Sequence, residues 1–236
     1  MAMSKPNSSL VLVGTVHRDP MGYTKLLRVL GKEQPSLITV EVSPYARTFR
    51  AGKAAALRAT LRKNLQSIQR EEGRPLREII SQSAILGIFL ILKEPYEWRA
   101  AKAYAHRQEI PLGDIDLSCY SKNKLSHLAD LVSMENLRTL LRIPSLDLSK
   151  QAESHYSRAR FLFSHPPSFW PVAREIRRRE TYMAEKIRNF FQQENGKKML
   201  HIGGWEHLIE FPQGGSLFGL LQDLRPQRIL VSSMGN

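Results

Sequence analysis

Two short segments of this chain place a histidine three residues after a glycine, next to an apolar run. Residues 14–17 read GTVH after the run LVLV, and residues 204–207 read GWEH after the run MLHIG. A neutral imidazole can accept a proton or bind a metal ion, and its ordinary pKa lies close to physiological pH. The repeated spacing raises the hypothesis that His17 and His207 serve one site.

Carboxylates accompany these histidines. Glu41 stands within the apolar run LITVEV, Asp114 and Asp116 lie in PLGDID, and Glu206 directly precedes the second histidine. Each has an ordinary explanation, because a strand glutamate can face water and aspartates often cap helices or loops. A single histidine after a strand is likewise more often structural than catalytic. Ligands of open parallel sheets bind beyond the carboxyl ends of the strands, so the joint pattern favours a cleft there.

A second anomaly lies in the predicted helix 171–194. Arg179 and Glu180 fall on the same helical face as an apolar stripe, so both are predicted to point towards the body of the protein. Buried charges are tolerated when they are paired or serve a site. The alternative is that both residues flank the stripe and extend their charged ends to water. The stripe consists of Ile176, Met183, Ile187 and Phe190.

Strands that alternate with helices predict an α/β fold with a mainly parallel sheet flanked by helices. We expect one domain over residues 1–236, with the strand-free segment 117–197 as a helical insertion or lid. The predicted strands are short apolar runs, as in a sheet covered on both faces; they are 10–16, 37–42, 110–115, 198–203 and 228–232. The predicted helices are 22–36, 52–71, 75–92, 97–109, 121–142, 149–162, 171–194 and 215–223.

Composition bounds the class of protein. The 236 residues are 42% hydrophobic and 24% charged, as in ordinary globular proteins. The single cysteine, Cys119, excludes an internal disulfide and a multi-cysteine zinc site. No apolar stretch reaches the roughly 20 residues of a membrane-spanning helix, and the N-terminus does not resemble a secretory signal. These features predict a cytoplasmic protein without a membrane span, and they leave a homo-oligomer open.

The formal net charge of +13 permits an acidic partner. Its basic residues are widely spread, with local clusters at 58–70 and 174–180. The sequence carries no helix-turn-helix, zinc-finger or RNP-like motif. We therefore expect a peptide or small-molecule substrate rather than nucleic acid, and an interaction with an acidic partner stays open as a regulatory role.

Five segments in this order resemble the TraB/PrgY/GumN family, which is related to the Tiki proteases and more distantly to ChaN and erythromycin-esterase-like proteins. The segments are GTVH at 14–17, Glu41, GDIDLSCYSKNKL at 113–125, RETYMAEKI at 179–187 and GGWEHL at 203–208. The chain departs from the family pattern in three places. Glu180 replaces an asparagine or aspartate, GDID lacks an arginine, and Trp205-Glu206 stands where small residues are usual.

The resemblance implies an α/β fold with both histidines in one cleft, and a metal-dependent hydrolase that acts on a peptide bond. Its metal ligands would be His17, His207 and Glu41, which suit zinc, manganese, cobalt or iron. The metal would lower the pKa of a bound water and polarise a carbonyl group.

The resemblance also implies roles for four other residues. Glu206 or Glu180 would act as the general base, and Arg179 would hold a substrate carboxylate or stabilise an oxyanion. Asp114 would orient a histidine without binding the metal itself.

Two other classes of function remain open. In a metal-free hydrolase, a histidine paired with a glutamate would activate water for ester or amide hydrolysis. This is the mechanism that the more distant resemblance to erythromycin-esterase-like proteins implies. In a binding protein of the ChaN type, the same histidines would be axial ligands of haem.

Overall fold

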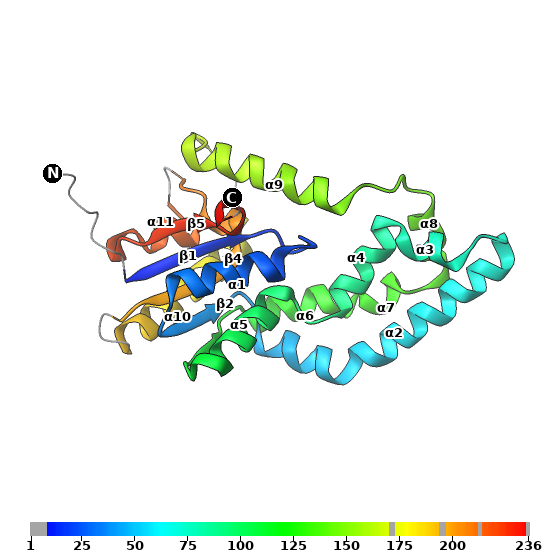
Figure 1. Ribbon diagram of the computed structural model, residues 1–236, viewed down its shortest axis with the longest axis horizontal. Helices are drawn as coiled ribbons and strands as arrows, with labels where there is room; N and C mark the ends of the chain where they lie inside the picture. Colours follow the sequence, from blue (N-terminus) through cyan, green and yellow to red (C-terminus); the bar gives the residue numbers. More distant parts are fainter. Residues whose placement is uncertain (1–8, 170–172, 194–196, 212–213, 235–236) are drawn as a thin grey trace.

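The computed structural model describes residues 9–169, 173–193, 197–211 and 214–234, and it contains a five-stranded sheet in which every pairing is parallel (Figure 1). The strand order is β3-β2-β4-β1-β5. The predicted α/β fold and parallel sheet are confirmed, with strand ends that differ by at most two residues from the predicted ones. The strands are β1 (Leu10–Thr15), β2 (Leu37–Val40), β3 (Leu112–Asp114), β4 (Met199–Gly204) and β5 (Gln227–Leu230).

Both faces of the sheet are covered, which explains why the strands are apolar without alternation. Val11 and Val13 of β1 pack in one core with helices α1 (Gly22–Glu33) and α5 (Tyr96–Gln108). Leu10 and Leu12 point to the opposite face and pack with α10 (Arg174–Gln193) and α11 (Leu217–Leu220). Alternate residues of one strand therefore enter two separate cores.

The pairing of β1 with β4 brings the two glycine-histidine segments together. Gly14 lies opposite Gly203, and Thr15 lies opposite Gly204. The strands are parallel neighbours, so both chains leave the sheet at the same edge. After β4 the chain turns at once into the short 3-10 helix η1 (Trp205–Leu208), which carries the second histidine.

The helix predicted at 52–71 begins earlier than expected. Helix α2 (Pro44–Glu72) starts four residues after β2, because Ser43 caps it: the Ser43 Oγ atom accepts a hydrogen bond from the Ala46 amide at 3.0 Å. Pro44 occupies the first helical position, where a missing amide proton costs nothing. Ser43-Pro44 was a start signal that the prediction missed.

The helix predicted at 75–92 is two helices, α3 (Leu76–Ser81) and α4 (Ser83–Leu92), separated by an extended Gln82. Hydrogen bonds tie this break to residues 145–146, which lie 62 and 63 positions further along the chain. The Ser83 amide donates to Ser145 Oγ at 3.1 Å, and the Leu146 amide donates to Ser83 Oγ at 3.0 Å. A tertiary contact therefore fixes the break between α3 and α4. No local sequence signal predicts this break.

The described residues of segment 117–197 form helices joined by non-helical stretches, among them 142–147 and 165–169, and none of them lies in a strand, as predicted. The single helix expected at 121–142 is three helices: α6 (Ser118–Ser126), α7 (Leu128–Leu131) and α8 (Met134–Leu141). Helix α9 (Leu148–Ser164) follows, and residues 170–172 and 194–196, where the predicted helix 171–194 begins and ends, lie outside the described residues. The region predicted at 215–223 holds α11 and the 3-10 turn η2 (Gln222–Leu224), and a last 3-10 turn, η3 (Val231–Met234), follows β5.

Helices α2, α3, α4, α7 and α8 gather beyond one end of the sheet, and α9 runs as a separate rod along its side (Figure 1). Residues from α4, α6 and α7 share a cavity with Glu41 and Gly203, which stand at strand ends. The helical body therefore overhangs the carboxyl edge of the sheet, where the sequence placed the cleft. Within the described residues, no helix is long and apolar enough to span a membrane.

Candidate functional site

The first histidine is held by a buried glutamate that the sequence analysis did not single out. His17 Nδ1 lies 2.8 Å from Oε1 of Glu97, in the first turn of α5. The hydroxyl of Thr15 lies 3.1 Å from the same oxygen. The Glu97 side chain is 3% exposed, whereas that of His17 is 57% exposed. A buried carboxylate thus fixes the orientation of a histidine that reaches solvent.

This contact sets the charge of His17. Desolvation opposes protonation, but the hydrogen bond to Glu97 and its charge, together with the charge of Glu41, raise the pKa of His17 to about 9. The charge of His207 works in the opposite direction. Nε2 of His17 makes no hydrogen bond with a described residue, so one nitrogen is anchored and the other faces the cleft.

Glu41 is the centre of a second group of contacts. Its Oε2 atom accepts the Gly204 amide at 2.6 Å, and its Oε1 atom lies 3.0 Å from Nε2 of His207 and also accepts from Arg179. Burial alone would raise the pKa of Glu41, but the charges of His207 and Arg179 hold it well below its usual range. The alternative explanation, a strand glutamate that faces water, is therefore wrong for Glu41, whose side chain is buried among these contacts.

Arg179 crosses from α10 to bind two carboxylates. Its Nε atom donates to Oδ1 of Asp116 at 2.6 Å, and its Nη2 atom donates to Oδ2 of the same residue at 2.9 Å and to Glu41. Its guanidinium also stacks on Tyr120, with Cζ 4.5 Å from the ring centroid. Burial works against the charge, but Glu41 and Asp116 raise the pKa of Arg179 above its ordinary value.

His207 lies between two carboxylates. Nδ1 contacts Oε1 of Glu180, and Nε2 contacts Glu41. Burial disfavours its charge, but the charge of Glu41 and the hydrogen bonds to both carboxylates raise the pKa of His207 to about 10. A carboxylate oxygen beside each ring nitrogen favours the protonated form of His207, in which both nitrogens donate. The predicted inward orientation of Arg179 and Glu180 agrees with their burial, 8% and 3% exposed.

A third histidine stands behind this group. His201 of β4 is fully buried, and its Nδ1 atom lies 3.1 Å from the hydroxyl of Thr39 on β2. Desolvation outweighs the charge of Glu41 and lowers the pKa of His201 to about 3. It is a neutral side chain of the sheet interior.

Gly204 lets the two histidines approach one point. A Cβ atom on Gly204 would lie 3.1 Å from Nε2 of His17, 3.5 Å from Oε2 of Glu41 and 3.5 Å from Cδ2 of His207. Any larger residue would occupy the space that these groups border. The glycine of the second glycine-histidine segment therefore has a steric reason.

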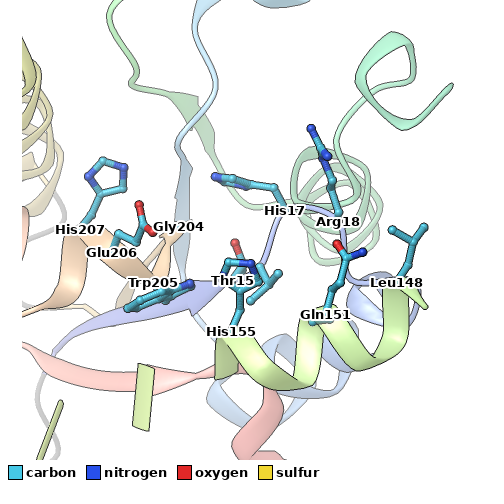
Figure 2. A pocket seen from close by; sticks show the side chains of 12 residues that line it. Thr15, His17, Arg18, Leu148, Gln151, His155, Gly204, Trp205, Glu206 and His207 are labelled. Atoms are coloured by element: carbon cyan, nitrogen blue, oxygen red, sulfur yellow. The ribbon is translucent and has the colours of Figure 1, made fainter. Parts of the chain in front are cut away.

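Three adjoining cavities meet at His17, with volumes of about 280, 490 and 260 Å³. Figure 2 shows the first, which is lined by His17 and Arg18, by Gln151 and His155 of α9, and by His207. The second reaches under α4, α6 and α7, and the third lies between His17, Glu41 and the α10 residues Arg179 and Glu180.

Two predicted residues do not have the expected contacts. Asp114 pairs with Arg47 at 2.6 Å and makes no hydrogen bond with a histidine in the part of the chain that the structure describes. The chain continues past β3 beside the end of β2, where the Asp116 amide donates to the Val42 carbonyl at 3.2 Å, and this places Asp116 within reach of Arg179. Glu206 is exposed and lines two cavities, and its side chain makes no hydrogen bond or ion pair with either histidine of the described site.

The predicted ligands His17, Glu41 and His207 border one space, but the donor atoms of Glu41 and His207 serve other contacts. Glu41 and His207 bond to each other, and the Arg179 guanidinium contacts both, with Nη1 3.2 Å from Nε2 of His207. A metal ion there would have to displace that cation. Across the described residues, no three His, Cys, Asp or Glu side chains form a group suited to a metal ion.

Comparisons with protein-family models, with curated proteins and with solved structures find no match for this chain. The resemblance to the TraB/PrgY/GumN family therefore stays a prediction from the sequence.

Proposed function

We propose that this protein is a hydrolase of ester or amide bonds in which His17, oriented by Glu97, is the general base. The observation that supports this most is the anchored and otherwise unoccupied imidazole at the junction of three cavities. A base held through one nitrogen by a carboxylate, with the other nitrogen aimed at the cleft, is the arrangement of histidine general bases.

The other histidine is unsuited to the same role. Both of its nitrogens contact carboxylates, Glu41 and Glu180, so it has no lone pair for an incoming water. Its charge instead contributes, with Arg179, to a positive environment beside the carboxylate of Glu41. Nη1 of Arg179 makes no bond with a carboxylate among the described residues, which leaves this nitrogen to stabilise a developing oxyanion.

The reaction proceeds in two steps. Nε2 of His17 takes a proton from water as the water oxygen forms a bond with the substrate carbonyl carbon, which gives an oxyanion near Arg179. The oxyanion collapses, the bond to the leaving alcohol or amine breaks, and His17 returns its proton to that leaving group. Glu97 keeps the ring in place and stabilises its charge through both steps.

Metal-dependent hydrolysis is the second candidate, because Nε2 of His17 and Oε2 of Glu41 border the same space above Gly204. In that case a bound zinc, manganese, cobalt or iron ion would supply an acidified water. A haem-binding protein of the ChaN type is a third class, in which His17 would offer its free nitrogen as an axial ligand. Metal analysis and a visible absorption spectrum of the purified protein separate these two classes from the metal-free hydrolase.

The test is a panel of ester and amide substrates, assayed between pH 7 and 9.5 with wild-type protein, His17→Ala and His155→Ala. His155 lines the same cavity from α9 and provides a matched control. We expect His17→Ala to lose about 100-fold or more in kcat/KM, whereas His155→Ala stays near wild type and chelators change nothing. Equal activity of the two variants would contradict the role of His17, and loss of activity in a chelator would favour the metal-dependent candidate.

A further inference from the structure

The largest of the three cavities around His17 is lined by three kinds of side chain: charged residues of the proposed site, an apolar group and further cations. Its floor carries Glu41 and Arg179 of the proposed site. Its wall is apolar and comes from the overhanging helices; it includes Leu90, Ile91, Leu125, Leu128 and Leu131. The volume of about 490 Å³ suits a small organic molecule.

Three further cations border this cavity: Arg18, Arg50 and Lys124. None of them makes an ion pair with another of the residues that the structure describes, in contrast to the doubly paired Arg179. Lys124 stacks on Tyr120, with Nζ 4.5 Å from the ring centroid. The cavity therefore has more positive charge than its own carboxylates neutralise.

Arg50 is held in place without a carboxylate. Its Nε atom lies 3.4 Å from the carbonyl of Ile91 and its Nη1 atom lies 3.3 Å from the carbonyl of Ala46. Desolvation lowers the pKa of Arg50, although Glu94 and Glu97 attract its charge from a distance. A partly buried guanidinium beside an apolar wall, with only carbonyl partners, is a site prepared for an anion.

Arg18 is the third cation that borders this cavity, and it lies in the loop after β1. It follows His17 in the chain and extends away from α9 (Figure 2). Its Nη1 atom would lie 3.4 Å from a Cβ on Gly87, so the guanidinium rests against α4. The cations thus come from the loop after β1, from α2 and from α6, and all face one apolar space.

We propose that this cavity binds a substrate with one anionic head group and an apolar body, and that the proposed hydrolysis acts on amphiphiles of this class. The head group contacts Arg18, Arg50 or Lys124, and the apolar body lies against Leu90 and Leu131. The hydrolysis of these amphiphiles rests on the proposed function, whereas their binding in the cavity does not depend on it. A carboxylate and a phosphate head share the required charge, and the test compares them.

The experiment is calorimetric titration of the whole chain with octanoate, octyl phosphate, octanol and octyltrimethylammonium, none of which needs turnover to bind. We expect the two anionic ligands to bind at least about tenfold more tightly than octanol, and the cationic one most weakly. Lys124→Gln and Arg18→Gln each reduce that preference. The double variant Arg62→Gln/Lys63→Gln removes exposed charge further along α2, about 18 Å from Arg50, and keeps it.

Leu90→Asp provides an independent test, because Leu90 is 37% exposed and tolerates a polar side chain. A carboxylate there repels octanoate and reverses the order of octanoate and octyltrimethylammonium. Octanoate binding no tighter than octanol, or equal losses in Lys124→Gln and the Arg62→Gln/Lys63→Gln control, would overturn the inference. His17→Ala retains octanoate binding while losing hydrolysis, so failure of the proposed reaction is distinguished from failure of this inference.

Discussion

Nδ1 of His17 lies 2.8 Å from Oε1 of Glu97, although the two residues are 80 positions apart in the chain. The contact joins the loop after β1 to the first turn of α5, and it aims the opposite ring nitrogen at the cleft. One buried partner thereby fixes the orientation of a titratable side chain and contributes most to raising its pKa.

Glu97→Gln tests that link in the free protein. Gln keeps the shape of the side chain but removes its charge, so the pKa of His17 falls from about 9 towards its ordinary value of 6.5. An NMR titration of the His17 imidazole measures the shift in wild type and variant. His155→Ala, which leaves the pair intact, keeps the wild-type value; a wild-type pKa near 6.5 would refute the link.

Arg179→Met removes the cation that binds Glu41 and Asp116. Two buried carboxylates then lose the cation that they share, and we expect the free energy of unfolding to fall by about 3–5 kcal/mol. The exposed pair of Arg138 and Glu71 provides the control, since Arg138→Met costs at most about 1 kcal/mol. Urea denaturation compares the three proteins, and equal stability of the two variants would show that the network is not buried as described.

Gly204→Ala places a methyl group 3.1 Å from Nε2 of His17. We expect roughly tenfold lower kcat/KM, because the imidazole must move from its position, with a change in stability of less than about 1 kcal/mol. Gly52→Ala is the matched control: its Cβ meets no atom within 4 Å, so activity is unchanged. Full activity in Gly204→Ala would mean that the space above this glycine is not used.

The pH dependence of stability reports on His207. Its pKa in the folded protein is raised from 6.5 to about 10, so the folded state binds the proton more tightly than the unfolded state. The stabilisation is complete below pH 6.5 and is lost as the pH rises through about 10. The urea midpoint of wild type therefore falls between pH 6.5 and 10, and that of His207→Gln falls less; parallel curves would contradict the raised pKa.

The sequence sufficed for the fold because parallel, doubly covered strands leave a strong pattern of short apolar runs. It also sufficed for the convergence of Glu41, Arg179, Glu180 and His207, since strand ends and one helical face bring these together. Strands β1 and β4 are neighbours in the sheet, which explains why the two histidines, each three residues after a glycine, border one space. The sequence does not show which strands are neighbours, so this relationship is seen only in the structure.

Glu97 and Asp116 were harder to find. Glu97 lies in the first turn of a helix, where acidic residues are common and usually solvated. The only sequence signal for an inward position is its two aromatic neighbours, Tyr96 and Trp98, which are buried in the structure. Asp114 and Asp116 are two residues apart, so the sequence offers no ground for choosing between them. The path of the chain beyond β3 decides that Asp116 meets Arg179 while Asp114 meets Arg47.

The pH profile of kcat/KM tests the central claim most directly, namely that His17 is the base and Glu97 sets its pKa. Glu97, Glu41, His207 and Arg18 are the charged or titratable neighbours of His17, and the first two raise its pKa. With the best ester of the panel, activity is predicted to rise with pH to an inflection near 9, and Glu97→Gln is predicted to move that inflection towards 6.5. An inflection at the same pH in both proteins would contradict the account.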